Sequence, residues 1–217
     1  LRCLVGSEMC IRDRSQPQKY MDKFSYAIGL GIGQNLLSMG AKGIEVDDFA
    51  QAIKDILEGN KTAISHAEAR DIVNKYFAEL EEKMNAASIE QGVQFLEENK
   101  KRPNVVTLPS GLQYEVINEG KVGTYAKATD QVKCHYEGTL IDGTLFDSSI
   151  KRGQPAVFGV NQVIPGWVEA LQLMPEGAKW KLYIPSDLAY GAQGAGEMIP
   201  PHSTLVFEVE LQKILSK

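Results

Sequence analysis

Residues 163–185 read VIPGWVEALQLMPEGAKWKLYIP, and the spacing of their apolar side chains changes partway through. In the first part, Trp167, Ala170 and Leu171 recur at the spacing of one helix face, directly after a Pro-Gly turn. In the second part, KWKLYIP has the alternation and the aromatic content of a strand. A short helix (166–173) followed directly by a strand predicts an α+β domain in which that helix packs on a sheet.

Three further segments flank this stretch and have the composition of strands: LQYEVIN (112–118), QVKCHYEGTL (131–140) and TLVFEVELQKI (204–214). They alternate or run apolar, and turns such as Ile-Asp-Gly-Thr at 141–144 separate them. Short connections of this kind join antiparallel strands. We therefore expect residues 103–217 to form a mostly antiparallel sheet wrapped on one short helix.

The preceding part of the chain has a helical period. One helix is expected at about 22–37, and an amphipathic one is expected at 46–57, where a Gly-Asn pair follows as a C-cap. The glycines at 29, 31 and 33 do not fit a nucleotide-binding loop, because no strand precedes them and the spacing fails. We expect these glycines to let two helices approach closely.

A third helix is expected to begin at Ser65, whose hydroxyl can cap it in a capping box with Glu68. No helix breaker follows before Pro103, so at about 1.5 Å per residue the helix is roughly 50 Å long. Its apolar residues are concentrated in the first half, whereas EEKMNAASIEQG (81–92) is mostly polar. We expect the first half to pack on another element and the second half to hold two bodies apart in water.

Two short helices and half of a long one bury too little apolar surface to be stable alone, which favours burial against a second copy of the chain. The expected organisation is therefore a helical dimerisation domain (21–64), a long connecting helix (65–102) and the sheet domain (103–217).

The first twenty residues lack the apolar segment and the cleavage site of a secretory signal, and part of them resembles translated adapter sequence. We expect residues 1–20 to be a non-native or disordered leader and Met21 to be the natural start. This interpretation favours a cytoplasmic location. The alternative is the periplasm, if a natural leader upstream of Met21 is missing.

Composition and charge argue against several classes of protein. The 217 residues are 43% hydrophobic and 24% charged, as in ordinary globular proteins. A net charge of -5 offers no basic stripe for nucleic acid, and no apolar run approaches the roughly 20 residues that span a membrane. Cys3, Cys10 and Cys134 show no metal-ligand spacing, so neither a metal site nor a disulfide framework is expected. We expect Cys134 to lie unpaired in a strand.

The sequence also lacks the usual catalytic motifs: there is no GxSxG, no HExxH and no nucleophilic cysteine with a partner. His66, His135 and His202 are scattered, which favours structural or surface roles. Asp147 is the one acidic residue in an aromatic, otherwise apolar context, although a turn or capping role is an alternative.

A set of aromatic and aliphatic residues clusters near the turns and the short helix of the second half. These side chains could form core or line a concave apolar pocket with few polar groups. The set comprises Tyr136, Phe146, Phe158, Val163, Ile164, Trp167, Tyr190, Ile199 and Phe207.

Three segments together resemble the FKBP-type peptidyl-prolyl cis-trans isomerases across roughly 111–214. They are HYEGTLIDGTLFDSS (135–149), VIPGWVEALQLMPEGAKWKLYIP (163–185) and LAYGAQGAGEMIPPHSTLVFEVELQKI (188–214). The helical half resembles the dimerising N-terminal domain of the bacterial macrophage infectivity potentiator (Mip) subgroup.

The resemblance implies a pocket with Trp167 as its floor, no metal and no cofactor. Tyr190 would donate to a peptide carbonyl, the backbone N–H of Ile164 would hold another, and Asp147 would accept from Tyr136. The implied catalytic residues are Tyr136, Phe146, Asp147, Trp167, Tyr190 and Phe207. The implied substrate contacts are Arg152, Phe158, Val163, Ile164 and Ile199, with Arg152 paired to Asp147.

Three positions depart from the family pattern: Ala156 replaces a common phenylalanine, Gln162 a common glutamate, and Ala195 stands where a histidine can occur. These departures affect the rim of the pocket, and with it the sequence preference and the affinity for macrolide inhibitors such as rapamycin.

The activity implied is isomerisation of X-Pro bonds in proline-containing unfolded or partly folded proteins, by desolvation and stabilisation of the twisted amide, without covalent chemistry. The alternatives are a holdase chaperone and a catalytically weak module that binds proline peptides.

Overall fold

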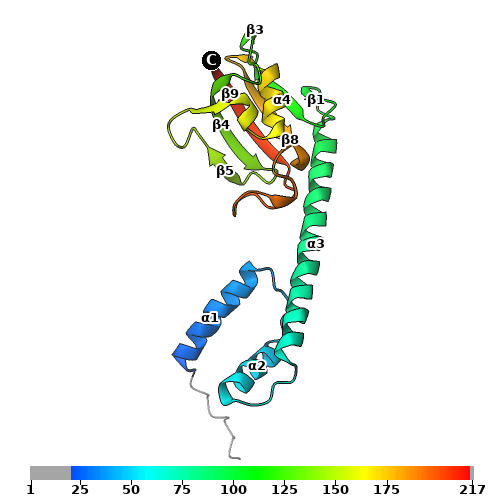
Figure 1. Cartoon of the computed structure of the whole chain (residues 1–217), viewed down its shortest axis with the longest axis vertical. Helices are drawn as coiled ribbons and strands as arrows, with labels where there is room; N and C mark the ends of the chain where they lie inside the picture. The colour runs from blue at the N-terminus through cyan, green and yellow to red at the C-terminus, as the bar shows by residue number, and fades with distance from the viewer. Residues whose placement is uncertain (1–20, 216–217) are drawn as a thin grey trace, which may run out of the picture. The chain divides into compact units, whose positions relative to one another are not determined.

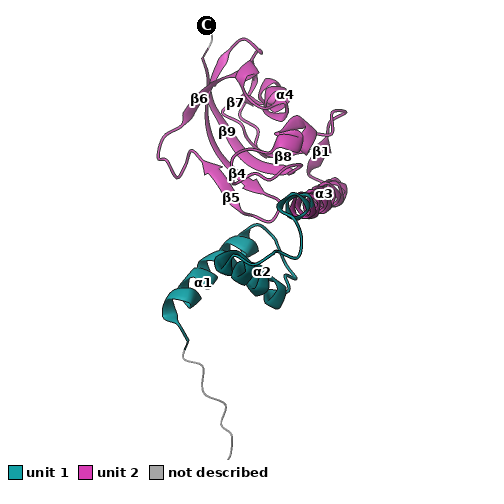
Figure 2. Cartoon of the chain, turned by 60° about the horizontal axis from the view of Figure 1, so that its bottom comes forward, with its two compact units in different colours: residues 1–71 teal, residues 72–217 magenta. Residues whose placement is uncertain are grey.

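The computed structural model describes residues 21–215, and its contacts divide the chain into two compact units, residues 1–71 and 72–217 (Figures 1 and 2). The division falls inside the long helix. The expected segment boundaries at 64/65 and 102/103 stay a prediction, and the expected leader, residues 1–20, lies outside the described residues.

The first unit contains helices α1 (Lys23–Ser38) and α2 (Val46–Glu58), close to their expected positions. Asp22 caps α1 by accepting a hydrogen bond from the backbone N–H of Ser25 at 2.9 Å. Gly59 ends α2 in the left-handed conformation (φ 69°), which glycine adopts without steric cost.

This first unit has no apolar core of its own. Among described residues 21–71, Ala41 is the only buried apolar residue, while Phe24 and Leu57 are 73% and 81% exposed. A Cβ added at the α1 glycines (29, 31 and 33) would meet nothing within 4 Å. The expected close approach of two helices through these glycines is therefore not formed within one chain.

Helix α3 (His66–Asn99) is the predicted third helix. The Ser65 hydroxyl accepts a hydrogen bond from the backbone N–H of Glu68 at 3.2 Å, so the predicted N-cap is confirmed.

The second half of α3 stands only partly in water: most of its residues are exposed, as expected, but one face packs on the sheet. The expectation that it holds two bodies apart stays a prediction. Gly92 and Asn99 are buried, and the Asn99 side chain donates to Gln113 Oε1 at 2.9 Å. Gln113 in turn donates to the carbonyl of Leu96 at 2.9 Å, and the rings of Phe95 and Tyr183 are 6.0 Å apart. On that face, the small Gly92 allows close approach and Asn99 makes a buried hydrogen bond.

The second unit contains a seven-stranded antiparallel sheet in the order β1-β2-β8-β9-β4-β5, with β6 also paired to β4, and a separate β3-β7 pair (Figure 1). The predicted antiparallel arrangement is confirmed. The strands are β1 (Val105–Thr107), β2 (Gln113–Asn118), β3 (Lys121–Tyr125), β4 (Gln131–Leu140), β5 (Leu145–Ser148), β6 (Ala156–Gly159), β7 (Pro175–Glu176), β8 (Lys179–Ile184) and β9 (Leu205–Leu215).

The short helix α4 (Pro165–Leu173) supplies the centre of the core. Its predicted stripe is buried: Trp167 is 3% exposed, and Ala170, Leu171 and Met174 are inaccessible. A Cβ at Gly166 would lie 2.6 Å from Ile184 Cγ2, so the glycine lets α4 approach β8 closely. Cys134 is buried in β4 as a free thiol, as expected. Three 3₁₀ turns complete the unit: η1 (Val160–Gln162), η2 (Ser186–Leu188) and η3 (Gly191–Gln193).

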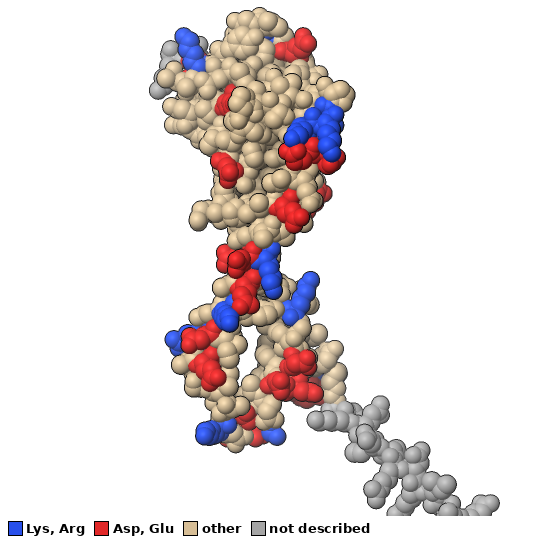
Figure 3. All heavy atoms as spheres, turned by 90° about the vertical axis from the view of Figure 1, so that its right-hand side faces the viewer, with Lys and Arg blue, Asp and Glu red and all other residues tan. Residues whose placement is uncertain are grey.

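Within the described residues, no helix is long and apolar enough to cross a membrane. On the face drawn in Figure 3, acidic and basic side chains are interspersed, and they form no extended basic patch on that face.

Replacing Asn99 with leucine tests the docking of α3. The substitution leaves Gln113, which is 3% exposed, without its side-chain partner, and should lower the free energy of unfolding by about 1–3 kcal/mol. Urea denaturation of the full chain measures this loss. Glu98→Ala, at the neighbouring exposed position, should change stability by less than about 0.5 kcal/mol. Equal stability of Asn99→Leu and the wild type would contradict a buried junction.

Candidate active site

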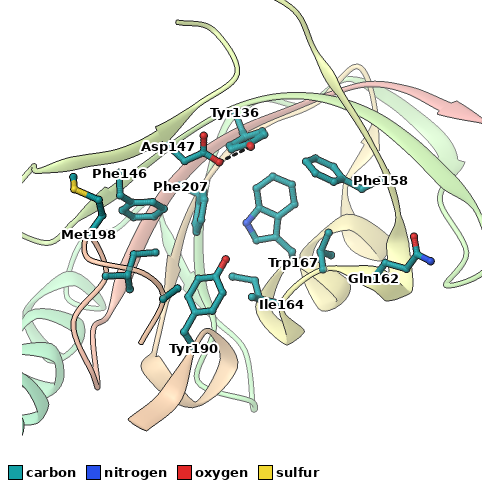
Figure 4. Close-up of a pocket in the computed structure, with 13 residues that line it drawn as sticks. Tyr136, Phe146, Asp147, Phe158, Gln162, Ile164, Trp167, Tyr190, Met198 and Phe207 are labelled. Carbon is teal, nitrogen blue, oxygen red and sulfur yellow. Dashed lines mark hydrogen bonds between the residues drawn. The ribbon is translucent and has the colours of Figure 1, made fainter. Parts of the chain in front are cut away.

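A pocket of about 620 Å³ opens on the second unit, where β4, β5, β6, η1, α4, β9 and the loop before β9 meet (Figure 4). Its lining is mostly aromatic and aliphatic, with a few polar groups. The lining residues are Tyr136, Phe146, Asp147, Phe158, Gln162, Val163, Ile164, Trp167, Tyr190, Ala195, Met198, Ile199 and Phe207.

Trp167 forms the floor of this pocket. Its indole meets the rings of Tyr136, Phe158 and Phe207 nearly at right angles, with centroids 5.3, 5.6 and 5.3 Å away. Edge-to-face pairs of this kind each contribute about 0.5–1.5 kcal/mol beyond the burial of their area. Trp167 Nε1 is buried and finds no acceptor among the described residues, so the indole is held by ring packing.

Two local features of the sequence explain how these aromatic rings come together at the pocket floor. Pro165 stands in the first turn of α4, where its missing N–H costs nothing, and the Ile164 carbonyl accepts from the N–H of Trp167 at 2.9 Å. In β4, a Cβ at Gly138 would lie 2.6 Å from both Phe146 and Phe207. The absent side chain lets those two rings pack over the strand, 5.4 Å apart.

One connected polar group, formed by Tyr136, Asp147 and Arg152, lies at the pocket wall. The Tyr136 hydroxyl donates to Asp147 Oδ2 at 2.6 Å and accepts from the Arg152 guanidinium at 2.7 Å. Arg152 also forms an ion pair with Asp147 and lies 5.5 Å from the centre of the Tyr136 ring. The geometric part of the prediction for Asp147 is therefore present: it accepts from Tyr136 and pairs with Arg152.

These contacts set the ionisation of the group. Burial alone would raise the pKa of Asp147, but the hydrogen bonds from Tyr136 and Arg152 and the Arg152 charge outweigh it, so this pKa lies below its ordinary value. Burial, with the hydrogen bond to Asp147, raises the pKa of Tyr136 above its ordinary value. At neutral pH the pair is a carboxylate and a neutral phenol.

Ser149 fixes the backbone beside this group. Its buried hydroxyl accepts from the N–H of Tyr136 at 2.7 Å and donates to the Tyr136 carbonyl at 3.1 Å. The His135 ring lies 3.0 Å from the same hydroxyl. The histidine expected to be structural therefore contacts a residue that supports the site and does not line the pocket.

Tyr190 approaches from the opposite wall and is 40% exposed. Figure 4 shows its hydroxyl pointing into the pocket. This places an O–H donor facing the aromatic floor, within a cavity whose other walls are largely apolar.

Ten of the eleven predicted site residues line the pocket. The eleventh, Arg152, does not line it but contacts Tyr136 and Asp147, which do. Their catalytic and binding roles stay predictions. The sequence left open whether these aromatic residues form core or line a pocket. Trp167 and Phe207 do both, because they belong to the core cluster and also line the cavity.

Of the three departures from the family pattern, Gln162 and Ala195 line the pocket, whereas Ala156 does not. Met198 was missed. Its only signal in the sequence is its place directly before Ile199 in a glycine-rich loop, which has no periodicity to read. Among the described residues, no group of His, Cys, Asp and Glu side chains could hold a metal ion.

Chemically, the arrangement can enclose an apolar ring of a ligand, exclude water around it and offer a hydroxyl donor at the edge. A planar amide attached to such a ring would lie between aromatic edges and the Tyr190 hydroxyl.

Comparison with known families matches both parts of the chain. The model of the FKBP-type peptidyl-prolyl cis-trans isomerases matches residues 123–212, and the model of the domain amino terminal to these isomerases matches residues 21–116.

Individual proteins match most of the chain. The FKBP-type 22 kDa peptidyl-prolyl cis-trans isomerase of Escherichia coli is 50% identical over 198 residues, 88% of this chain and 94% of the relative. The outer membrane protein MIP of Legionella longbeachae is 40% identical, over 95% of this chain and 91% of the relative. The crystal structure of FkpA from Escherichia coli is similar with a TM-score of 0.74 and 34% identity, over 89% of this chain and 96% of that one.

Proposed function

The chain belongs to the family of FKBP-type peptidyl-prolyl cis-trans isomerases, and we propose that its pocket accelerates X-Pro rotation by excluding water and stabilising the twisted amide. Rotation about a peptide bond meets a barrier of about 18–20 kcal/mol because it breaks amide resonance. No covalent bond to the substrate is required. The pocket therefore needs only to bind the twisted state more tightly than the planar one.

Desolvation accounts for the tighter binding of the twisted amide relative to the planar one. A planar amide carries a charge separation that water stabilises, and twisting reduces it. In an apolar, water-excluding cavity the planar state loses this hydration, while the twisted state loses less. The main support for the proposal is the aromatic floor of the pocket: Trp167 is 3% exposed and meets three aromatic rings edge to face below the cavity.

The polar groups have restricted roles in this proposal. The Tyr190 hydroxyl donates to a carbonyl of the bound peptide, and by resemblance the Ile164 N–H holds a second one. Asp147 remains ionised, orients Tyr136 and contributes its charge to the site without transferring a proton.

Replacing Trp167 with leucine tests the floor. We expect kcat/KM for a Leu-Pro peptide to fall about 30-fold, equivalent to about 2 kcal/mol of transition-state stabilisation. The free energy of unfolding should also fall, by about 2–4 kcal/mol, because Trp167 is buried and the leucine loses its edge-to-face contacts with three rings. Isomerisation kinetics and urea denaturation of the same variant give both numbers.

Leu171→Val is the matched control, since Leu171 is inaccessible on the same helix and does not line the pocket. It should cost about 1 kcal/mol of stability and leave kcat/KM within about two-fold. A kcat/KM for Trp167→Leu within about two-fold of the wild type, as expected for Leu171→Val, would make Trp167 an ordinary core residue.

The proposed partner of the first unit is a second copy of the chain. Residues 21–71 bury one apolar residue, Ala41, while α2 presents a continuous apolar face formed by Phe49, Ala52, Ile53, Ile56 and Leu57. A unit with so little internal burial is not expected to stay folded alone. In the dimer, the two isomerase domains act on proline-containing unfolded or partly folded clients, and macrolide inhibitors such as rapamycin compete for the pocket.

A holdase chaperone is the second candidate, favoured by the same exposed apolar side chains of α1 and α2. A fragment of residues 21–102 separates the two functions. Suppression of client aggregation by this fragment would support the holdase role. A catalytically weak module that binds proline peptides would instead show peptide affinity without rate enhancement in the isomerisation assay.

We propose a cytoplasmic location, where a reducing environment keeps the free thiol of Cys134 unpaired, with the periplasm as the alternative. Cell fractionation of the natural protein decides between the two compartments.

A further inference from the structure

The loop of residues 194–204 forms one wall of the pocket. Ala195, Met198 and Ile199 line the cavity, and Ala195 and Ile199 exchange two backbone hydrogen bonds of 2.9 and 3.1 Å. The remaining residues of the loop turn away from the pocket and lead into β9.

This loop has a strained backbone at one point. His202 is the one non-glycine residue with positive φ (57°) among described residues 21–215, and its N–H donates to the Gly191 carbonyl at 2.8 Å. A left-handed conformation costs a non-glycine residue about 1–2 kcal/mol, so neighbouring contacts must hold it in place. The Ser203 hydroxyl, which donates to the Pro200 carbonyl at 2.7 Å, supplies one such contact.

Helix α3 supplies two further contacts from outside the loop. The Ser88 hydroxyl donates to the Pro201 carbonyl at 3.2 Å. One helical turn later, Gly92 is buried against Thr204, and a Cβ at position 92 would lie 2.5 Å from Thr204 Oγ1. Thr204 is itself 5% exposed. The helix therefore contacts the loop at both Pro201 and Thr204, on either side of the strained residue.

The surrounding packing makes these two contacts important. A cavity of about 190 Å³ lies between α3, the β4–β5 turn and the loop, lined by Ser88, Gln91, Leu140, Ile141, Asp142, Pro200, Ser203 and Thr204. Because this space is open, the back of the loop is not held by continuous close packing. The hydrogen bond from Ser88 and the close approach of Gly92 support the back of the loop beside this space.

We propose that Ser88 and Gly92 of α3 are positioning residues for isomerisation: they hold residues 200–204, and thereby fix Ile199 and Met198 as the wall of the pocket. The inference rests on the proposed isomerase function. It makes the connecting helix part of the catalytic apparatus, although neither residue touches the substrate.

A double-mutant cycle in the full-length protein tests this coupling. Gly92→Ala should push Thr204 aside and lower kcat/KM for a Leu-Pro peptide about three- to ten-fold, mainly through a higher KM. Thr204→Ala removes the clashing Oγ1, so adding Gly92→Ala in that background should change kcat/KM by less than two-fold. Val93→Ala, at the neighbouring position whose side chain is 57% exposed, should match the wild type.

A second pair of variants addresses the hydrogen bond. Ser88→Ala should raise KM two- to three-fold, whereas Ser88→Thr, which keeps the donor, should restore it. The melting temperature of Gly92→Ala should stay within a few degrees of the wild type, because the higher helix propensity of alanine offsets part of the cost of the clash with Thr204.

Three results overturn the inference. They are an unchanged kcat/KM in Gly92→Ala, an equal loss of kcat/KM when Gly92→Ala is added to Thr204→Ala, or a loss of kcat/KM in these variants that is proportional to their loss of melting temperature. An inactive wild type is a different result, because it overturns the isomerase function itself.

Discussion

Asp147→Ala should lower kcat/KM for a Leu-Pro peptide about 30-fold. The carboxylate accepts a 2.6 Å hydrogen bond from the Tyr136 hydroxyl and forms an ion pair with Arg152. A hydrogen bond to a charged group contributes about 1.5–3 kcal/mol, and 1.4 kcal/mol corresponds to a factor of ten in rate. Without the carboxylate, Tyr136 and Arg152 lose their common partner at the pocket wall. Peptide binding should persist, because the apolar floor is unchanged.

Asp147→Asn is the matched control, because it keeps the shape and one acceptor for the Tyr136 hydroxyl while removing the charge. An asparagine variant close to wild type would assign the effect to orientation of Tyr136. One as slow as the alanine variant would assign it to the charge. Unchanged kcat/KM in Asp147→Ala would refute a role of this residue in the reaction.

Ile53→Asp should convert the proposed dimer into a monomer. Ile53 lies in the middle of the apolar face of α2, and an unpaired carboxylate there cannot be buried without a cost of several kcal/mol. The measured mass should fall to that of one chain, 23.9 kDa, and far-UV circular dichroism should lose helix signal from α1 and α2. Activity on a short peptide should stay within about two-fold of wild type, because the pocket lies within the second unit.

Gln51→Glu controls for added charge, since two residues along a helix turn a side chain to roughly the opposite face from Ile53. This variant should remain dimeric. A wild type with the mass of one chain, or an Ile53→Asp variant that keeps the dimer mass, would contradict the proposed partner.

Much of the second unit could be predicted from the sequence because its periods are clear. The Trp167, Ala170 and Leu171 stripe predicted α4, and alternation predicted the strands at 131–140 and 179–184. The pairing of Asp147 with Tyr136 and Arg152 followed from the family resemblance, since no local pattern links residues in different strands and loops.

The docking of α3 could not be predicted in this way. Ser88, Gly92 and Asn99 are small or polar, and a hydropathy pattern assigns such residues to solvent. Their contacts depend on close approach and on buried hydrogen bonds, which depend on the tertiary structure. The missing core of residues 21–71, by contrast, could be predicted, because two short helices and part of a third offer little internal burial of apolar surface.

Isomerisation of X-Pro bonds by desolvation, without proton transfer, can be checked by measuring the solvent isotope effect on kcat/KM across pH 5–9. The lowered pKa of Asp147 keeps its contacts with Tyr136 and Arg152 intact above the ordinary value of 3.8, and they are lost only as the pH falls through the lowered pKa. The raised pKa of Tyr136 keeps its phenol neutral through this range.

Isomerisation without proton transfer should give a kcat/KM that does not change from pH 5 to 9 and a solvent isotope effect of about 1. A bell-shaped profile with an isotope effect of about 2 or more would mean that a proton moves in the transition state, and would contradict the account.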